Sequence, residues 1–239
     1  MSSFDLDDLA RGYAYRQPST ATRKRARDAA RDQSGILLDV GGGTGAHAGE
    51  WAMGGGVPIV VDPSGQMCSI AATRRGVEVV TARAEMLPFV GRSAGLVYFH
   101  LSIHYGALDA VIDEACRVAV PGARIEIWTF APETMASSAL ARWFPSIGPI
   151  DAARFPEIDR IVEHLSQRGA SVEVLAMPEV VERTAASWQE AVANRFVSTL
   201  QLISSDEMAR GLARFAETYP DPNDVYRYTI DFVRVRATR

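Results

Sequence analysis

Short apolar runs alternate with longer segments of helical period along the first half of the chain. The runs are rich in valine, isoleucine and leucine and have the length of buried strands, and the segments between them repeat apolar residues at helical spacing. This alternation predicts a mostly parallel sheet with helices on both faces. The predicted strands are residues 35–40, 57–62, 77–81, 96–100 and 124–130, and the predicted helices between them are residues 46–53, 64–75 and 108–120.

The alternation is interrupted after residue 130. Residues 131–156 contain four prolines and no clear strand, which is typical of an insertion. Beyond it the pattern predicts a helix over 157–168, a strand over 171–175, helices over 187–202 and 206–219, and a final strand from residue 225. Because no linker composition separates the two halves, we expect the later strands to join the first sheet.

The composition describes an ordinary globular chain. An apolar content of 47% over 239 residues is enough for a sizeable core, which excludes a disordered protein. Cys68 and Cys116 form no CxxC motif, so they encode neither a disulfide framework nor a thiolate metal site. No apolar run has the length of a membrane span, and the first residues lack the features of a signal peptide. We therefore expect a cytoplasmic protein without a membrane partner.

The charge is unevenly distributed. Residues 11–31 hold seven basic side chains against one acidic one, a charge of +6, although the whole chain carries −4 and the remainder therefore −10. The basic side chains point around most of a helix and have only Tyr13 and Tyr15 as aromatic neighbours, which favours a solvated helix over a nucleic-acid surface. We expect no nucleic-acid partner.

The sequence ILLDVGGGTGAHA is the most informative part of the chain. An apolar strand ends in Asp39 and runs through Gly41, Gly43 and Gly45 into a helix. Glycines let the backbone approach a ligand closely, and the helix N-terminus behind them presents unpaired N–H groups. The spacing also satisfies the fingerprint of a dinucleotide-binding loop, and Asp62 stands where a ribose-binding acid belongs in either interpretation.

Three features favour a different ligand. Asp39 places a carboxylate where a pyrophosphate would be repelled and an ammonium group stabilised. The glycine strand begins some 35 residues into the chain, behind a predicted helix, whereas a dinucleotide fold usually starts with this strand. The segment 82–105 has no role in the dinucleotide fingerprint. An amino-acid moiety next to the glycines is the better interpretation.

Five motifs in order resemble the class I S-adenosylmethionine-dependent methyltransferases, in particular the small-molecule group related to ubiquinone-biosynthesis and trans-aconitate methyltransferases. The motifs are LDVGGGTG, VVDPSGQM, AEMLPF, LVYFHLSIHY and EACRVAVPGARIEIWTF. The resemblance implies an α/β, Rossmann-like, doubly wound sheet of seven strands, mostly parallel with an antiparallel last strand, with helices on both faces and helical lid insertions. We predict a single domain over 1–239, composed of a helical lid at 1–34, a cofactor-binding half at 35–130 and a substrate-side half at 131–239.

The resemblance also implies a cofactor, S-adenosylmethionine, and the residues that bind it. Asp39 and the backbone of Gly41, Gly42 and Gly43 would hold its methionine portion, and Asp62 would accept both ribose hydroxyls. Pro63 and Met67 would flank the adenine, Ala84 and Glu85 would reach its edge, His100 would lie beside the transferred methyl, and Tyr13 with Tyr15 would close over the cofactor. Arg83 departs from the family, where many members carry an Asp. For Asp39 and Asp62 the alternative is capping of a turn, and for Met67 it is core packing.

Two histidines are candidates for the catalytic chemistry. His100 and His104 follow the fourth predicted strand, at the sheet edge where open α/β proteins bind ligands, and histidine is the natural base near neutral pH. A strand-end polar residue and a helix cap are the alternatives for the pair. No third ligand is evident, so we predict no metal site. His47 and His164 are interpreted as helix-surface residues.

Substrate recognition is expected in the second half. Arg154 and Arg195 are candidates for a substrate carboxylate, and the aromatic candidates for an apolar pocket, most of which we expect in the core instead, are Trp143, Phe144, Phe155, Trp188 and Phe196. We predict a methyltransferase of a small molecule, with oxygen slightly preferred as the acceptor. The alternatives are a cofactor-binding protein that does not methylate, a nucleic-acid methyltransferase and an oxidoreductase of the nicotinamide type.

Overall fold

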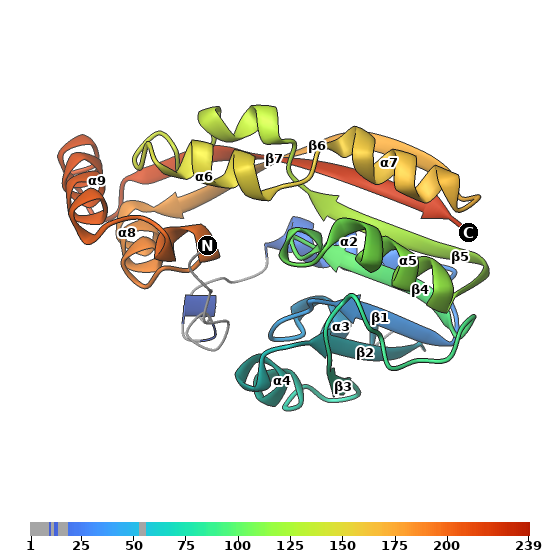
Figure 1. Ribbon diagram of the computed structural model, residues 1–239. Helices are drawn as coiled ribbons and strands as arrows, with labels where there is room; N and C mark the ends of the chain where they lie inside the picture. Colours follow the sequence, from blue (N-terminus) through green and yellow to red (C-terminus); the bar gives the residue numbers. More distant parts are fainter. Residues whose placement is uncertain (1–9, 11, 14–18, 53–55) are drawn as a thin grey trace. The chain divides into compact units, whose positions relative to one another are not determined.

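The structure, a computed structural model, describes residues 10, 12–13, 19–52 and 56–239 (Figure 1). The chain divides into two compact units. One, here called the sheet unit, comprises Pro18–Thr129, Pro156–Leu175 and Val233–Arg239. The other, here called the insert unit, comprises Met1–Gln17, Phe130–Phe155 and Ala176–Phe232. The division into one cofactor-binding and one substrate-side half stays a prediction, as does the single domain.

Seven strands form one sheet, as predicted. Its order is β3, β2, β1, β4, β5, β7, β6, so the sequence order reverses between β1 and β4. The pairs from β3 to β5 are parallel, and β7 runs antiparallel to β5, with Ile127 opposite Val235. The strands are β1 Ile36–Val40, β2 Val57–Asp62, β3 Glu78–Thr81, β4 Ala94–His100, β5 Ala119–Thr129, β6 Ser171–Thr184 and β7 Val225–Thr238.

Helices cover both faces of the sheet unit. Along β4, Val97 and Phe99 point to one face, where they join the core under α5 (Leu108–Val118) and α7 (Ile158–Gln167). Tyr98 points to the opposite face, where its ring meets Trp51 of α3 (Ala46–Trp51). This alternation follows from the two-residue period of a strand. The remaining described helices are α2 Thr20–Ala30, α4 Gly65–Ala71, α6 Ile147–Arg154, α8 Ala185–Ala193 and α9 Ser205–Thr218, with short 3₁₀ segments at Ile103–Tyr105, Pro132–Ser137 and Ser198–Gln201.

Several predicted boundaries were wrong. The helix predicted over 108–120 ends at Val118, because the Pro121-Gly122 pair lies within β5 and not after a helix: the N–H of Gly122 donates to the carbonyl of Arg239. The helix predicted over 187–202 is two segments, and Arg195, with φ of 51°, lies in the break between them. The strand predicted at 171–175 extends to Thr184.

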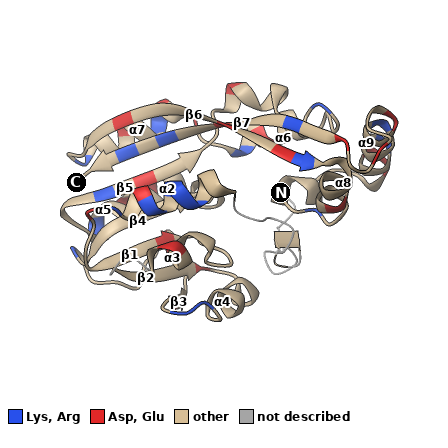
Figure 2. Cartoon of the chain, turned by 180° about the vertical axis from the view of Figure 1, so that it is seen from behind, with Lys and Arg blue, Asp and Glu red and all other residues tan. Residues whose placement is uncertain are grey.

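Helix α2 is fixed to the sheet unit by specific contacts. The indole of Trp51 donates to the carbonyl of Ala26 over 2.7 Å, and the guanidinium of Arg25 lies 4.7 Å from the ring centre of Trp128. Arg124 donates to two carbonyls at the C-terminal end of the helix. The exposed basic side chains of α2 pair with acidic ones, for example Lys24 with Asp28 of the same helix, so both charge signs lie along it (Figure 2).

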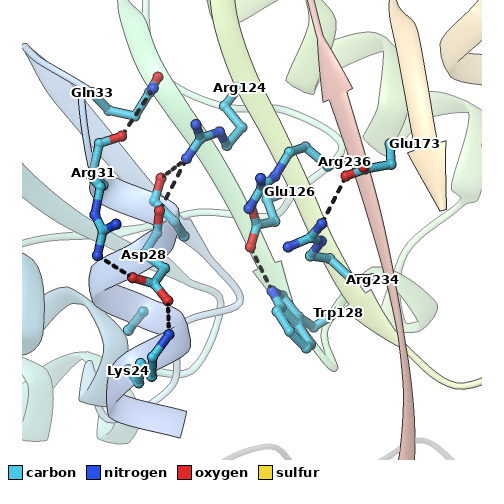
Figure 3. A network of polar contacts seen from close by, with 12 residues as sticks. Lys24, Asp28, Arg31, Gln33, Arg124, Glu126, Trp128, Glu173, Arg234 and Arg236 are labelled. Atoms are coloured by element: carbon cyan, nitrogen blue, oxygen red, sulfur yellow. Dashed lines mark hydrogen bonds and ion pairs between the residues drawn. The ribbon is translucent and has the colours of Figure 1, made fainter. Parts of the chain in front are cut away.

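A buried carboxylate lies where α2 and the last strand meet β5 (Figure 3). Glu126 is only 1% exposed; it accepts from the indole of Trp128 at 2.9 Å and from Nε of Arg236 at 2.8 Å. Two residues away along β7, Arg234 pairs instead with Glu173, whose side chain is 56% exposed. The carboxylate of the Arg236–Glu126 pair therefore lies in the interior, and that of the Arg234–Glu173 pair lies at the surface.

We expect the two pairs to differ in their effect on stability. Arg236→Gln leaves the buried carboxylate of Glu126 without its cation and should lower the free energy of unfolding by about 3 kcal/mol. Glu173→Gln, the matched control, removes an exposed partner and should change it by less than about 1 kcal/mol. Urea denaturation of both variants measures the difference. Equal effects would contradict the assignment of Glu126 to the interior network.

Candidate functional site

The glycine loop after β1 is pressed against the segment after β4. Gly41, Gly43 and Gly45 have φ of 67°, 56° and 71°, the left-handed conformation that favours glycine. A Cβ on Gly41 would lie 2.4 Å from Cβ of Ser102, whose hydroxyl donates to the carbonyl of Val40 over 2.6 Å. The chain ends of β1 and β4 thus meet at the point where the strand order reverses, which is where open α/β sheets bind ligands. No sequence motif marks Ser102 as part of this edge.

Asp39 is completely buried beneath this loop. Its Oδ2 accepts from the N–H of Ala48 at 3.3 Å, and its Oδ1 has no hydrogen-bond partner among the described residues. Burial is the main reason that its pKa rises to about 7, and the nearby charge of Asp62 raises it further. A Cβ on Gly42 would lie 2.6 Å from the carboxyl carbon of Asp39. A buried acid with an unused oxygen next to bare backbone fits a cationic group of a ligand.

Asp62 ends β2 and joins two loops. Its Oδ2 accepts from the N–H of Gly43 and its Oδ1 from the N–H of Ser64, both at 2.9 Å. The hydrogen bond from Ser64 is the turn cap that is the alternative role of Asp62. The hydrogen bond from Gly43 connects Asp62 to the glycine loop. Because each carboxylate oxygen has more than one lone pair, these contacts leave acceptor capacity for ligand hydroxyls. Pro63 is exposed, and Met67 is buried in α4.

The segment after β3 is fixed to the segment after β4. Glu85 accepts from Arg83 at 3.0 Å and from the N–H of Ala107 at 3.3 Å. Burial pushes the pKa of Glu85 up, but its backbone hydrogen bonds and the contact with Arg83 outweigh burial and lower that pKa overall. Arg83, the departure from the family pattern, therefore pairs with the residue two positions on. Ala84 between them is half-buried.

His100 is the last residue of β4 and is half-buried. It lies opposite Trp128 of β5, and the N–H of the next residue, Leu101, donates to the carbonyl of Trp128 over 2.8 Å. Leu101 has φ of 54°, so the chain turns sharply after the histidine. His104 follows in the 3₁₀ segment, with its ring centre 4.2 Å from that of the exposed Tyr105.

The prediction for His47 was wrong. We placed it on a helix surface, but it is 9% exposed, and its ring centre lies 4.4 Å from that of His100. The helix is only six residues long, which is too short for hydrophobic periodicity to show its buried face. His164 is partly buried too: its Nε2 lies 2.7 Å from an oxygen of Asp109, which links α7 to α5.

The substrate candidates in the insert unit mostly pack as its core. Trp143, Phe144 and Trp188 are buried together, and the indole of Trp143 donates to the hydroxyl of Tyr226 over 3.0 Å. Phe155 is buried against Phe130, whereas Phe196 is only partly buried beside the same core. Most of these aromatic side chains therefore pack in the core, as we expected.

The two candidate arginines of this unit have internal contacts. Arg154 donates to Thr199 at 2.8 Å and to Ser198 at 3.1 Å, and Arg195 donates to the carbonyl of Leu200. Tyr13 also belongs to the insert unit, whereas Tyr15 lies outside the described residues. Their roles in substrate or cofactor binding stay predictions.

The structure brings most of the predicted cofactor residues to one edge of the sheet. Asp39 lies near the end of β1 and the glycines follow that strand, Asp62 ends β2 with Pro63 and Met67 after it, Ala84 and Glu85 follow β3, and His100 ends β4. Hydrogen bonds from Gly43 to Asp62 and from Ala107 to Glu85 connect these loops. Within the described ranges, no group of three or more acidic, histidine or cysteine side chains is arranged to hold a metal ion.

The comparison with known families identifies the same part of the chain. Residues 38–127 match the family model described as "Methyltransferase domain". A malonyl-[acyl-carrier protein] O-methyltransferase from Methylococcus capsulatus is 30% identical over 112 residues, 44% of this chain and 41% of that protein. A biotin biosynthesis bifunctional protein from Cellvibrio japonicus is 32% identical over 102 residues, 41% of this chain and 20% of that protein. The chain thus aligns with less than half the length of either relative.

Solved structures extend the likeness in fold to most of the chain. A candidate methyltransferase of an antibiotic biosynthesis pathway from Anabaena variabilis has a TM-score of 0.75 at 22% identity and covers 94% of this chain and 99% of that one. The geranyl diphosphate C-methyltransferase of Streptomyces coelicolor, in complex with S-adenosyl-L-homocysteine, has a TM-score of 0.58 at 14% identity, over 92% and 78%. Residues 38–127 thus match a methyltransferase domain, and the chain shares the fold of solved methyltransferases over most of its length, which confirms the predicted resemblance and fold.

The buried acid predicts a pH-dependent stability. In the unfolded chain Asp39 releases its proton near its ordinary pKa of 3.8, but in the folded chain only near 7, so its burial costs more stability as the pH rises between these values. Asp39→Asn carries no charge at any pH. Thermal and urea denaturation without ligand should show that this variant gains roughly 3 kcal/mol on the wild type between pH 5 and pH 8.

Asp28→Asn is the matched control, because its hydrogen bond with Lys24 lowers the pKa of Asp28. Between pH 5 and pH 8 this acid is ionised in both states, and the difference from wild type should stay constant. A difference for Asp39→Asn that is equally constant would show that Asp39 is ionised in the folded chain at pH 5.

Proposed function

We propose that this protein transfers the methyl group of S-adenosylmethionine to a small-molecule acceptor. The observation that carries the proposal is the combination of Asp39, buried with an unused oxygen, and Asp62, tied to the glycine loop, at the ends of adjacent strands. The first suits the ammonium of an amino acid and the second suits the hydroxyls of a ribose. S-adenosylmethionine contains both groups, one on each side of its sulfonium.

Different residues would bind different parts of the cofactor. Oδ1 of Asp39 would accept from the ammonium, the backbone of Gly41 to Gly43 would lie along the methionine portion, and Asp62 would accept from both ribose hydroxyls. Pro63 and Met67 would flank the adenine, and Ala84 and Glu85 would reach its edge.

The cofactor, when bound, supplies a methyl group already activated by a sulfonium. The protein therefore has to orient the acceptor in line with that methyl and to exclude water, and orientation alone contributes roughly 7 to 11 kcal/mol to such reactions. An alcohol or phenol acceptor also has to lose a proton, which a ring nitrogen of His100 would accept, with His104 as the second candidate. Tyr98 is no rival base, because burial and then the charge of Glu126 raise its pKa well above the ordinary value, so the phenol stays neutral.

Oxygen is the acceptor atom we favour. The pair of histidines near the end of β4 suits a hydroxyl, and the relative from Methylococcus capsulatus is named an O-methyltransferase. A carboxylate acceptor would need no base, and His100 would then only orient it. We further propose a cytoplasmic location, in keeping with the two free cysteines. Among the described residues, none of the helices combines the length and apolar character that a membrane span requires.

Acceptor profiling with methyl-labelled S-adenosylmethionine tests the proposal. We expect label to appear in a small molecule, and we expect Asp62→Ala to bind S-adenosylhomocysteine at least about tenfold more weakly in calorimetry, because it loses charge-assisted hydrogen bonds worth roughly 1.5 to 3 kcal/mol. Unchanged affinity in a folded Asp62→Ala variant would contradict the ribose assignment. Binding without transfer to any acceptor would favour a cofactor-binding protein that does not methylate, and preference for a nicotinamide dinucleotide would favour the oxidoreductase.

The role of the histidines is tested by the turnover rate of histidine variants. If His100 is the base, the turnover rate rises with pH through a histidine ionisation, and His100→Ala lowers it by about 10²- to 10⁴-fold while S-adenosylhomocysteine still binds. His104→Ala and the double variant, measured at saturating cofactor, show which ring matters. Turnover close to wild type in the double variant would leave orientation as the main mechanism.

A further inference from the structure

Four aromatic rings from α3 and β4 form a row that ends at His100. His47 and Trp51 lie four residues apart on α3 and so share a face, and Tyr98 and His100 lie two apart on β4 and share a face as well. Trp51 meets Tyr98 edge-on at 5.4 Å between ring centres, His47 lies 5.3 Å from Tyr98, and His47 lies 4.4 Å from His100. Residues four apart on a helix and residues two apart on a strand are separated by similar distances along their elements. The two pairs of rings therefore interdigitate.

The exposure of the side chains increases along the row toward His100. Trp51 and Tyr98 are 1% and 0% exposed, His47 is 9% exposed, and only His100 is half-buried. The indole of Trp51 is held by the carbonyl of Ala26 in α2. His47 is therefore packed between the buried rings of Trp51 and Tyr98 and the half-buried His100.

His47 also connects this row to the glycine loop. It is the second residue of α3, two positions after Gly45, and the N–H of the next residue, Ala48, donates to Asp39. Any shift of the glycine loop or of Asp39 thus moves the start of α3 and, with it, the ring that lies against His100. The chain connection from Gly45 to His47 and the hydrogen bond from Ala48 to Asp39 are not themselves contacts with the cofactor in the proposed function.

We propose that His47 is a positioning residue that sets the orientation of the His100 ring and couples it to the glycine loop. The inference rests on the proposed function, because it gives His100 its role beside the transferred methyl. A ring packed against a side chain is restricted in its rotation, and a misplacement of about 1 Å in a reacting group can lower a rate about 10²-fold. The His47 ring supplies that packing from the side of the cofactor loop.

The test compares two substitutions of His47. His47→Ala removes the ring, and His47→Phe keeps an aromatic ring at the same place without its nitrogens. His164→Ala is the matched control, a partly buried histidine whose Asp109 contact lies outside the row. Each variant is measured for its melting temperature, its affinity for S-adenosylhomocysteine, its kcat and KM, and the ring signals of His100 in NMR spectra of histidine-labelled protein, assigned with His100→Gln.

We expect His47→Ala to lower kcat by about tenfold or more, with the affinity for S-adenosylhomocysteine within about threefold of wild type, and His47→Phe to restore most of the loss. The His100 ring signals should move toward those of free histidine in His47→Ala, because the neighbouring ring is gone, and stay shifted in His47→Phe. His164→Ala should leave all four readouts close to wild type. If His47→Ala does not fold, His47→Gln takes its place.

The NMR readout separates this proposal from the proposed function. Unmoved His100 ring signals in a folded His47→Ala variant would overturn the positioning role, whether or not the protein methylates any acceptor. An unchanged kcat together with moved signals would also overturn it, because the ring orientation would then not matter to turnover. Signals that move in a protein that binds S-adenosylhomocysteine but transfers no methyl would contradict the proposed function and leave the ring contact supported.

Discussion

The burial of one carboxylate constrains everything at the ligand edge of this sheet. Asp39, one residue before the end of β1, has no exposed surface, and the one hydrogen bond described for its side chain comes from the N–H of Ala48 in α3. The loop between the two must be narrow, and a Cβ on Gly42 would meet the carboxyl group itself. Gly42 is therefore required by the acid as much as by a ligand, because only bare backbone fits over the carboxyl group at this position.

The position of the other groups follows from this arrangement. The narrow loop brings the N–H of Gly43 to Asp62, so the two acids come to lie near each other, and the charge of Asp62 raises the pKa of Asp39 further. It also fixes where α3 begins, which places His47 against His100. A cationic ligand group beside Asp39 would relieve the burial cost, and the free energy stored in the unliganded acid would then contribute to selectivity for such a ligand.

The sequence predicted the sheet well because buried parallel strands are continuous apolar runs, and it predicted the ligand edge because the glycines and acids directly follow those runs. It failed where the cause lies in distant contacts. Nothing local marks His47 as buried, since its neighbours across the core are Tyr98 and His100, some fifty residues away. The end of α5 was misplaced because Pro121-Gly122 reads as a helix stop, although its partner is the carbonyl of Arg239. Trp143 and Trp188 could not be assigned to core or pocket by residue type alone, because aromatic side chains serve both.

Calorimetry of S-adenosylhomocysteine binding in buffers of different ionisation enthalpy tests the central claim, that the buried acid of β1 is the partner of the ligand ammonium. A pKa of about 7 means that the free protein holds a proton on Asp39 at pH 6, and the bound ammonium should displace it. We expect release of close to one proton per bound ligand at pH 6, only about one tenth at pH 8, and none at either pH in Asp39→Asn. Binding that is equally tight in Asp39→Asn and releases no proton at pH 6 in the wild type would contradict it.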